Sequence, residues 1–114
     1  MFGLGGRNSL FLRILDFILS RSDDELAELS VKSLASEFNV SRRVLEYEFE
    51  KGAIRTAEYI DRCRLYRAAK LLKSRPDLKI EEIACRLGFS SCKHFRRCFK
   101  TFFRVLPRQY RIPR

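Results

Sequence analysis

Residues 80–111 of the chain have the sequence IEEIACRLGFSSCKHFRRCFKTFFRVLPRQYR. The stretch predicts a short helix over Ile80–Leu87, because its first turn holds two acidic residues, which the helix dipole favours. Gly88 then tolerates the positive φ of a tight turn, and Ser90 or Ser91 caps a second helix that reaches about Phe102. A short helix, a tight turn and a second helix make a helix-turn-helix unit.

The same arrangement occurs earlier in the chain. Ala35, Asn39, Val40 and Ser41 recur 49 residues later as Ala84, Gly88, Phe89 and Ser90, and Leu45 and Phe49 recur 50 residues later as Phe95 and Phe99. In each unit the small alanine lets two helices approach closely, and the apolar residues of the second helix anchor it on the first. The sequence therefore predicts two helix-turn-helix units, with Ser30 and Ser41 capping the two helices of the first.

The rest of the chain is also helical in pattern, without lasting strand-like alternation, so we expect an all-α fold of about seven helices. We expect residues 1–8 to form a flexible leader, residues 9–55 the first helix-turn-helix subdomain, residues 56–75 a long linking helix and residues 76–114 the second subdomain. Ser22–Leu29 is expected to be an acidic connection. Arg64, on the linking helix, is expected to make a buried hydrogen-bonded link between the two halves.

Size and charge narrow the class of protein. A chain of 114 residues, 46% of them hydrophobic, suits one compact domain with a real core and leaves no room for a separate catalytic domain. The net charge is +10, and residues 91–114 carry eight basic and no acidic side chains, whereas residues 31–54 are neutral. An acid-free basic segment with interleaved aromatic residues indicates a surface that faces phosphates.

Other classes of site are not supported. The four cysteines include no C-x-x-C pair and His94 is the one histidine, so neither a zinc site nor any other cofactor is expected. The apolar run Leu10–Leu19 is interrupted by Arg13 and Asp16 and is too short to span a membrane. We expect a reduced cytoplasmic protein, with Cys63, Cys85 and Cys98 as small buried fillers.

A resemblance to a known family becomes specific at this point. The C-terminal signature of the AraC/XylS family of bacterial transcription regulators resembles Ile80, Ile83, Ala84, Gly88, Phe89, Ser90, Ser91, Phe95, Phe99, Lys100, Pro107, Tyr110 and Arg111. The first unit and linking helix of that family resemble Leu34, Ala35, Ser41, Leu45, Phe49, Tyr59, Arg64 and Ala68. The likeness covers about residues 9–112. Two departures concern local loops, since Arg104 stands where the family usually has Gly and Gly52 is out of register.

The resemblance implies a sequence-specific regulator that binds double-stranded DNA and is an activator rather than a repressor. It implies two recognition helices that enter successive major-groove segments, RNA polymerase as a protein partner, no membrane, and an N-terminal sensing domain in a longer native chain. The implied base-facing residues are Arg42, Arg43, Glu46 and Tyr47 in the first unit and Cys92, Lys93, His94, Arg96 and Arg97 in the second. The implied phosphate contacts are Ser41, Ser91, Lys100 and Arg104.

Two other functions stay open at this point. A protein-interaction domain would use Phe11 and the acidic Ser22–Leu29 segment as its docking surface, and the neutral first unit favours this alternative. An enzyme is the weaker alternative, because one histidine, no convergent acid–base pair and no phosphate loop leave little to catalyse with. A cysteine methyl acceptor would rest on Cys92 and Cys98 alone.

Overall fold

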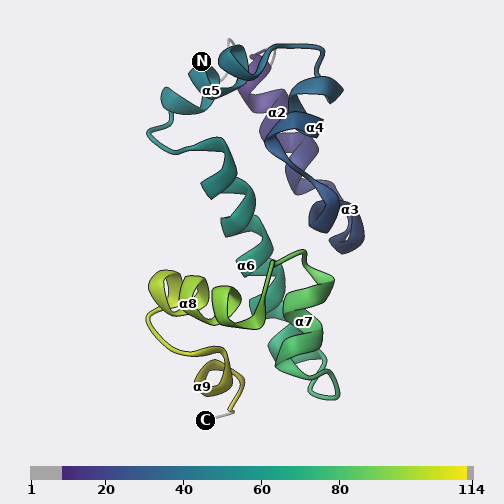
Figure 1. Cartoon of the computed structure of the whole chain (residues 1–114), viewed down its shortest axis with the longest axis vertical. Coiled ribbons are helices and arrows are strands. Elements are labelled where there is room, and N and C mark those ends of the chain that lie inside the picture. The colour runs from purple at the N-terminus through teal and green to yellow at the C-terminus, as the bar shows by residue number, and fades with distance from the viewer. Residues whose placement is uncertain (1–8, 113–114) are drawn as a thin grey trace.

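The computed structural model describes residues 9–112, and the expected leader, residues 1–8, lies outside the described residues, as do residues 113–114. Every regular element in the described part is helical, which confirms the all-α fold (Figure 1). The helices are α2 (Leu10–Leu19), α3 (Asp23–Glu28), α4 (Val31–Glu37), α5 (Arg42–Glu50), α6 (Thr56–Ser74), α7 (Ile80–Arg86), α8 (Cys92–Phe103) and α9 (Pro107–Arg111). In residues 9–112 no helix is both long enough and apolar enough to cross a membrane.

Serine side chains begin five of these helices. The hydroxyl oxygen accepts a hydrogen bond from the backbone N–H three residues later at Ser9, Ser22, Ser30, Ser41 and Ser91. Each such cap contributes about 1 kcal/mol to helix stability. The expected caps at Ser30 and Ser41 are confirmed, and Ser91 rather than Ser90 caps α8.

The two helix-turn-helix turns share one geometry. Asn39 has a φ of 54° and Gly88 a φ of 84°, so both adopt the left-handed conformation. In the first unit the N–H of the next residue, Val40, donates to the carbonyl oxygen of Ala35 at 3.0 Å. Phe89 and Ala84 form the same bond at 3.1 Å in the second unit. The repeat predicted from the sequence is therefore a repeat of backbone structure.

The buried residues form two clusters, one in each unit. Leu45 and Phe49 of α5 anchor the first cluster, and Phe95 and Phe99 of α8 anchor the second; all four are 0% exposed. Helix α6 serves both clusters. Its buried residues up to Cys63 belong to the first and those from Leu65 onward to the second. The linking helix is therefore a shared wall of two small cores.

The expected acidic connection at Ser22–Leu29 is wrong, because the segment contains a helix, α3. Ser22 and Glu25 form a capping box: the Ser22 hydroxyl accepts from the Glu25 N–H at 3.1 Å, and the Ser22 N–H donates to a Glu25 carboxylate oxygen at 2.9 Å. Three acidic residues in the first turn suit the helix dipole, and Leu26 is fully buried. The described residues consequently hold eight helices, one more than the seven that the sequence pattern indicates.

The two departures from the family pattern have structural outcomes just after the second helix of each unit. Arg104 follows α8 with a φ of 70°, the left-handed conformation that a glycine reaches more easily. Behind α5, Ala53 takes a φ of 59°, one residue later than Gly52. Both loops keep a left-handed turn without a glycine at the turn position.

Candidate nucleic-acid interface

Helix α8 has one buried face and one cationic face. Phe95 and Phe99 lie in the core, and the exposed side presents cations at positions separated by three, four and seven residues, which share one face of a helix. These exposed cations are Lys93, Arg96, Arg97 and Lys100. Because the buried phenylalanines fix the rotation of α8 about its own axis, they also fix the direction in which the cations point.

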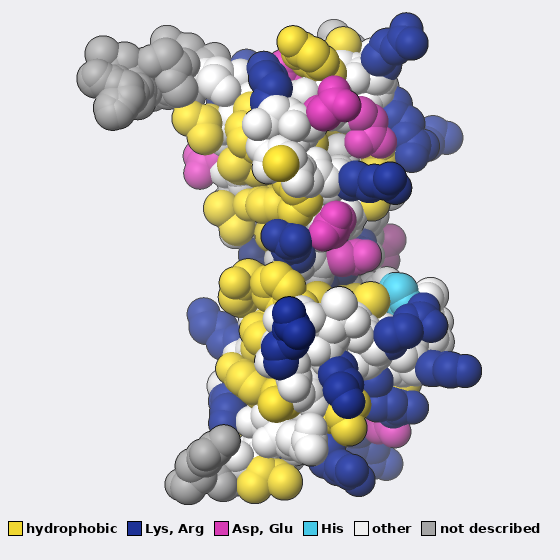
Figure 2. All heavy atoms as spheres, turned by 90° about the vertical axis from the view of Figure 1, so that its left-hand side faces the viewer, with side chains coloured by type: hydrophobic (Ala, Val, Ile, Leu, Met, Phe, Trp, Pro, Cys, Tyr) yellow, Lys and Arg dark blue, Asp and Glu magenta, His cyan; other side chains and the backbone are white. Residues whose placement is uncertain are grey.

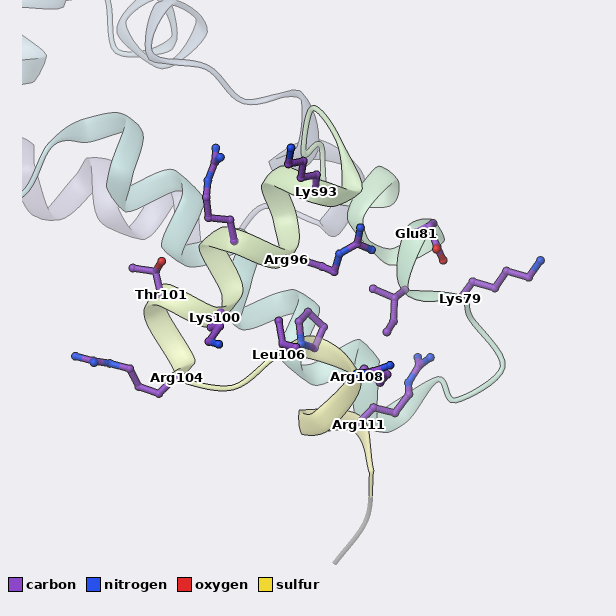
Figure 3. Close-up of a pocket in the computed structure, with 13 residues that line it drawn as sticks. Lys79, Glu81, Lys93, Arg96, Lys100, Thr101, Arg104, Leu106, Arg108 and Arg111 are labelled. Carbon is purple, nitrogen blue, oxygen red and sulfur yellow. The ribbon is translucent and has the colours of Figure 1, made fainter.

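These cations line a groove bounded by α8, the start of α7 and the α9 segment (Figure 3). We call it the α8 groove. Its charged residues are Lys79, Lys93, Arg96, Arg97, Lys100, Arg104, Arg108 and Arg111, with Glu81 as the one acid of the lining. In Figure 3 Arg96 extends from α8 toward the α7 side, where Lys79 and Glu81 lie, and Arg108 and Arg111 lie below it. Cations gathered in one groove repel each other, and a polyanion relieves that repulsion.

Helix α5 lies beside a second groove, whose charges are balanced. We call it the α5 groove, and its charged lining residues are Arg42, Arg43, Arg55, Glu46, Glu50 and Glu58. Tyr47 also lines it and is 59% exposed. In the face shown in Figure 2, acidic side chains lie mainly over the upper half of the molecule, which holds this groove, and Lys and Arg dominate the lower half. The two units therefore offer unequal attraction to an anion.

Glu46 is held by neighbours within the chain. The Thr56 hydroxyl, which is fully buried, donates to one carboxylate oxygen of Glu46 at 3.0 Å. The guanidinium Nε of Arg42 lies 3.5 Å from the other oxygen. Glu46 therefore joins α5 to the start of α6 and orients Arg42.

Cys92 and His94 lie beside the cationic face of α8 and contact other residues of α8 and of the turn before it. Arg96 donates to the Sγ of Cys92 at 2.9 Å. The ring centroids of His94 and Phe89 are 6.0 Å apart, the Nε2 of His94 is 3.6 Å from the Sγ of Cys98, and its Nδ1 is 3.3 Å from a guanidinium nitrogen of Arg97. The structure thus gathers Lys93, Arg96 and Arg97 in the groove and sets Cys92 and His94 at its flank.

Sequence reasoning overlooked several cations of the two grooves. Lys79 and Arg108 come from the start of α7 and from α9 and reach the α8 groove only through the tertiary fold. Arg108 could have been predicted as a groove residue, because it belongs to the acid-free basic segment at the end of the chain. No pattern in the sequence indicated Lys79. Arg111 has a structural role, because its guanidinium donates hydrogen bonds to the carbonyl oxygens of Leu72 at 3.1 Å and Arg75 at 3.0 Å, near the end of α6.

The cysteines differ in exposure. Cys63 is buried as expected and Cys98 half-buried, but the expectation for Cys85 is wrong, since it is exposed on α7. Burial raises the pKa of the Cys63 thiol. Burial, and secondly the Asp61 carboxylate, raise the pKa of the Cys98 thiol. Within residues 9–112, groups of three or more metal-ligating side chains placed for one ion are absent.

The docking surface of the alternative interaction domain is partly engaged within the chain. The Phe11 ring packs edge-on against Phe49, with ring centroids 5.2 Å apart. On α3, the Asp23 carboxylate pairs with Arg67 at 2.8 Å. Phe11 and Asp23 are therefore engaged with the rest of the first unit and with α6, whereas Asp24, Glu25 and Glu28 of the same segment are exposed.

The comparisons with known proteins agree with this geometry. Residues 34–112 match a family described as a helix-turn-helix domain. The chain is 38% identical over 84 residues to the HTH-type transcriptional regulator GbdR of Pseudomonas aeruginosa, covering 73% of this chain and 23% of GbdR. It is 31% identical over 99 residues to the HTH-type transcriptional activator RhaS of Escherichia coli O1:K1, covering 85% of this chain and 35% of RhaS. The chain thus spans well under half the length of either relative.

A solved structure gives the same assignment. The chain resembles a transcriptional regulator from Chromobacterium violaceum, described as AraC-type with a DNA-binding domain, with a TM-score of 0.79 and 28% identity over 94% of this chain and 93% of that one. The family match covers more than half of the chain and includes both turns, α8 and the α8 groove. The chain therefore belongs to the AraC family of helix-turn-helix DNA-binding transcription regulators.

Proposed function

We propose that this chain binds a specific site in double-stranded DNA and activates transcription by inserting α5 and α8 into successive major-groove segments. The observation that carries the proposal is the division of α8 between a buried face, Phe95 and Phe99, and an exposed cationic face. The major groove admits one α-helix, and a helix held in this way can enter it with its cations toward base edges and phosphates. The name of RhaS, an activator, favours activation over repression.

The proposed contacts follow from the two grooves. Arg96 and Arg97 are suited to bidentate contact with guanine, and Lys93 with Cys92 and His94 stands near the base edges at the start of α8. On α5, Arg42, Arg43 and Tyr47 face the DNA, and Glu46 acts by orienting Arg42. The proposed phosphate contacts are Ser41 and Ser91 at the helix starts, together with Lys79, Lys100, Arg104 and Arg108.

The setting of this activity is part of the same proposal. Residues 9–55 and 76–114 would act as the two DNA-contacting units and residues 56–75 as their link. An activator contacts RNA polymerase in the bacterial cytoplasm, and the much greater length of GbdR and RhaS favours a sensing domain in a longer native chain.

A salt-titrated binding assay tests the proposal, on duplexes selected from a random library. We expect log K to fall steeply as log[salt] rises, because bound cations release counterions from the phosphates. Footprinting is expected to show two protected segments on one DNA face, about 10 base pairs apart. The matched control is Arg13→Ala with Lys70→Ala, which removes as much charge as Arg96→Ala with Arg97→Ala but lies outside both grooves. A flat salt response, or a preference for single strands, contradicts the proposal.

A further inference from the structure

Helix α3 is fastened to the linking helix by two arginines of α6. The Arg64 guanidinium donates to three carbonyl oxygens at the end of α3, those of Leu26 at 3.2 Å, Ala27 at 3.3 Å and Leu29 at 2.7 Å. One turn further along α6, Arg67 donates to the carbonyl oxygens of Leu19 at 3.0 Å and Arg21 at 2.7 Å and to the carboxylate of Asp23 at 2.8 Å. These bonds tie both ends of α3 to the middle of α6.

The same helix also touches the second unit. Helix α3 packs against α7 as well as α6 (Figure 1). The backbone of Ala27 lies so close to Gly88 that a Cβ at position 88 would stand 2.5 Å from the Ala27 carbonyl oxygen and 2.9 Å from its Cα. Gly88 is the turn residue of the second unit, four residues before α8 begins. The first unit therefore contacts the turn that sets the direction of α8.

This contact matters because the two cores are separate. Between them runs α6, whose residue Arg64 stands where the first buried cluster ends and the second begins. A single helix bends along its length, so it fixes the rotation of one unit against the other only loosely. A second attachment away from the α6 axis, at Ala27 and Gly88, removes that freedom.

We propose that α3, held by Arg64 and Arg67, is a strut that fixes the distance and rotation between α5 and α8, so that the chain selects DNA by the spacing of its two half-sites. The proposal rests on the proposed function, in which both helices dock. Each base pair added between half-sites moves one of them by about 3.4 Å and turns it by about 35°. A rigidly braced pair of helices cannot follow such a change, whereas a pair joined by α6 alone can adapt.

The test compares wild type with the double variant Arg64→Lys, Arg67→Lys. Lysine keeps the charge, but its single ammonium group cannot replace a planar fork that reaches three acceptors. Affinity is measured for the selected duplex and for duplexes with one base pair inserted or deleted between the half-sites. We expect wild type to lose at least about tenfold in affinity at the altered spacings, and the variant less than about threefold. The control is Arg62→Lys, on the same helix, whose partner is the exposed Glu58 at 3.0 Å; it should behave as wild type.

The outcomes separate the strut from the proposed function. The strut is overturned if the double variant shows the same spacing preference as wild type. It is also overturned if the affinity of wild type does not change with spacing and wild type binds a duplex that has a single half-site. A wild type that binds no duplex overturns the proposed function itself. If circular dichroism shows the double variant unfolded, Arg67→Lys alone replaces it, and an unchanged spacing preference in that variant overturns the strut.

Discussion

The carbonyl oxygen of Ala27 occupies the space in which a side chain at Gly88 would begin, 2.5 Å from the position of its Cβ. Gly88 also has a φ of +84°, which L side chains rarely adopt. Two independent requirements therefore act on this residue, the left-handed turn of the second unit and the close approach of α3. The equivalent turn residue of the first unit, Asn39, meets the first requirement alone and carries a side chain.

Replacing Gly88 should therefore cost more stability than replacing its counterpart. We expect Gly88→Ala to lower the free energy of unfolding by about 2–3 kcal/mol, because the backbone strain is joined by a clash with main-chain atoms. The control, Asn39→Ala, should lower the free energy of unfolding by about 1 kcal/mol, since it introduces backbone strain without a clash. Urea unfolding monitored by circular dichroism measures both. Equal losses would show that α3 moves away from Gly88 without cost.

Arg104 should show a trade between stability and binding. Its left-handed conformation costs a non-glycine residue about 1 kcal/mol, so Arg104→Gly is expected to raise the free energy of unfolding by that amount. The same change removes a cation from the α8 groove and should weaken duplex binding. Arg104→Ala is the matched control, because it removes the cation and keeps the strain. A glycine variant that binds DNA as tightly as wild type would remove Arg104 from the interface.

The two units should contribute unequally to affinity. We expect Arg96→Ala and Arg97→Ala each to weaken binding to the selected site by about 1–3 kcal/mol, as for an arginine that contacts guanine. Arg43→Ala should cost less, because the α5 groove holds as many acidic as basic side chains. Affinities for one duplex at one salt concentration give the comparison. Equal losses in all three variants would contradict a dominant second unit.

Local patterns in the sequence predicted most of the helices and the principal face of the site. Phe95 and Phe99 are four residues apart and therefore lie on one face of α8, with the cations on another. The buried face and the charged face of that helix could thus be predicted from the periodicity of the sequence. The missed helix α3 also had a local signal, the S-x-x-E pattern of Ser22 and Glu25. The exposure of Cys85 was likewise readable, because it lies two residues from both Ile83 and Leu87, on the opposite side of α7 from these buried residues.

Other features depend on tertiary contacts that no local pattern contains. Lys79 joins the α8 groove only because α7 begins beside α8. The engagement of Glu46 depends on Thr56, ten residues away and on another helix. The closeness of Ala27 and Gly88 depends on both units being packed on α6. A positive φ is by itself a sufficient reason for a glycine in a turn. Nothing in the sequence therefore indicated that Gly88 also allows the close approach of Ala27.

Thiol labelling should distinguish the four cysteines by environment. The thiolate is the reactive form, and burial raises the pKa of both Cys63 and Cys98. We therefore expect an alkylating reagent at neutral pH to modify Cys85 and Cys92 before the other two. Mass mapping of labelled peptides over time measures the order. Early labelling of Cys63 would show that the first core opens on the timescale of the reaction.

Bound DNA should then separate Cys92 from Cys85. Cys92 lies in the first turn of α8, and its Sγ accepts a hydrogen bond from Arg96. A duplex whose major groove receives α8 should therefore cover Cys92. Cys85 is exposed on α7 in a hollow lined by Leu78, Glu81, Glu82 and Arg86, which includes no cation of α8, and it should label at the same rate with and without duplex. A bulky adduct on Cys92 should abolish binding, because the major groove has no room beside a docked helix. The variant Cys92→Ser should bind DNA and resist this inactivation, and Cys85→Ser should be inactivated as wild type is. Equal protection of both cysteines, or normal binding by the Cys92 adduct, would mean that α8 enters DNA with a different face from the one proposed.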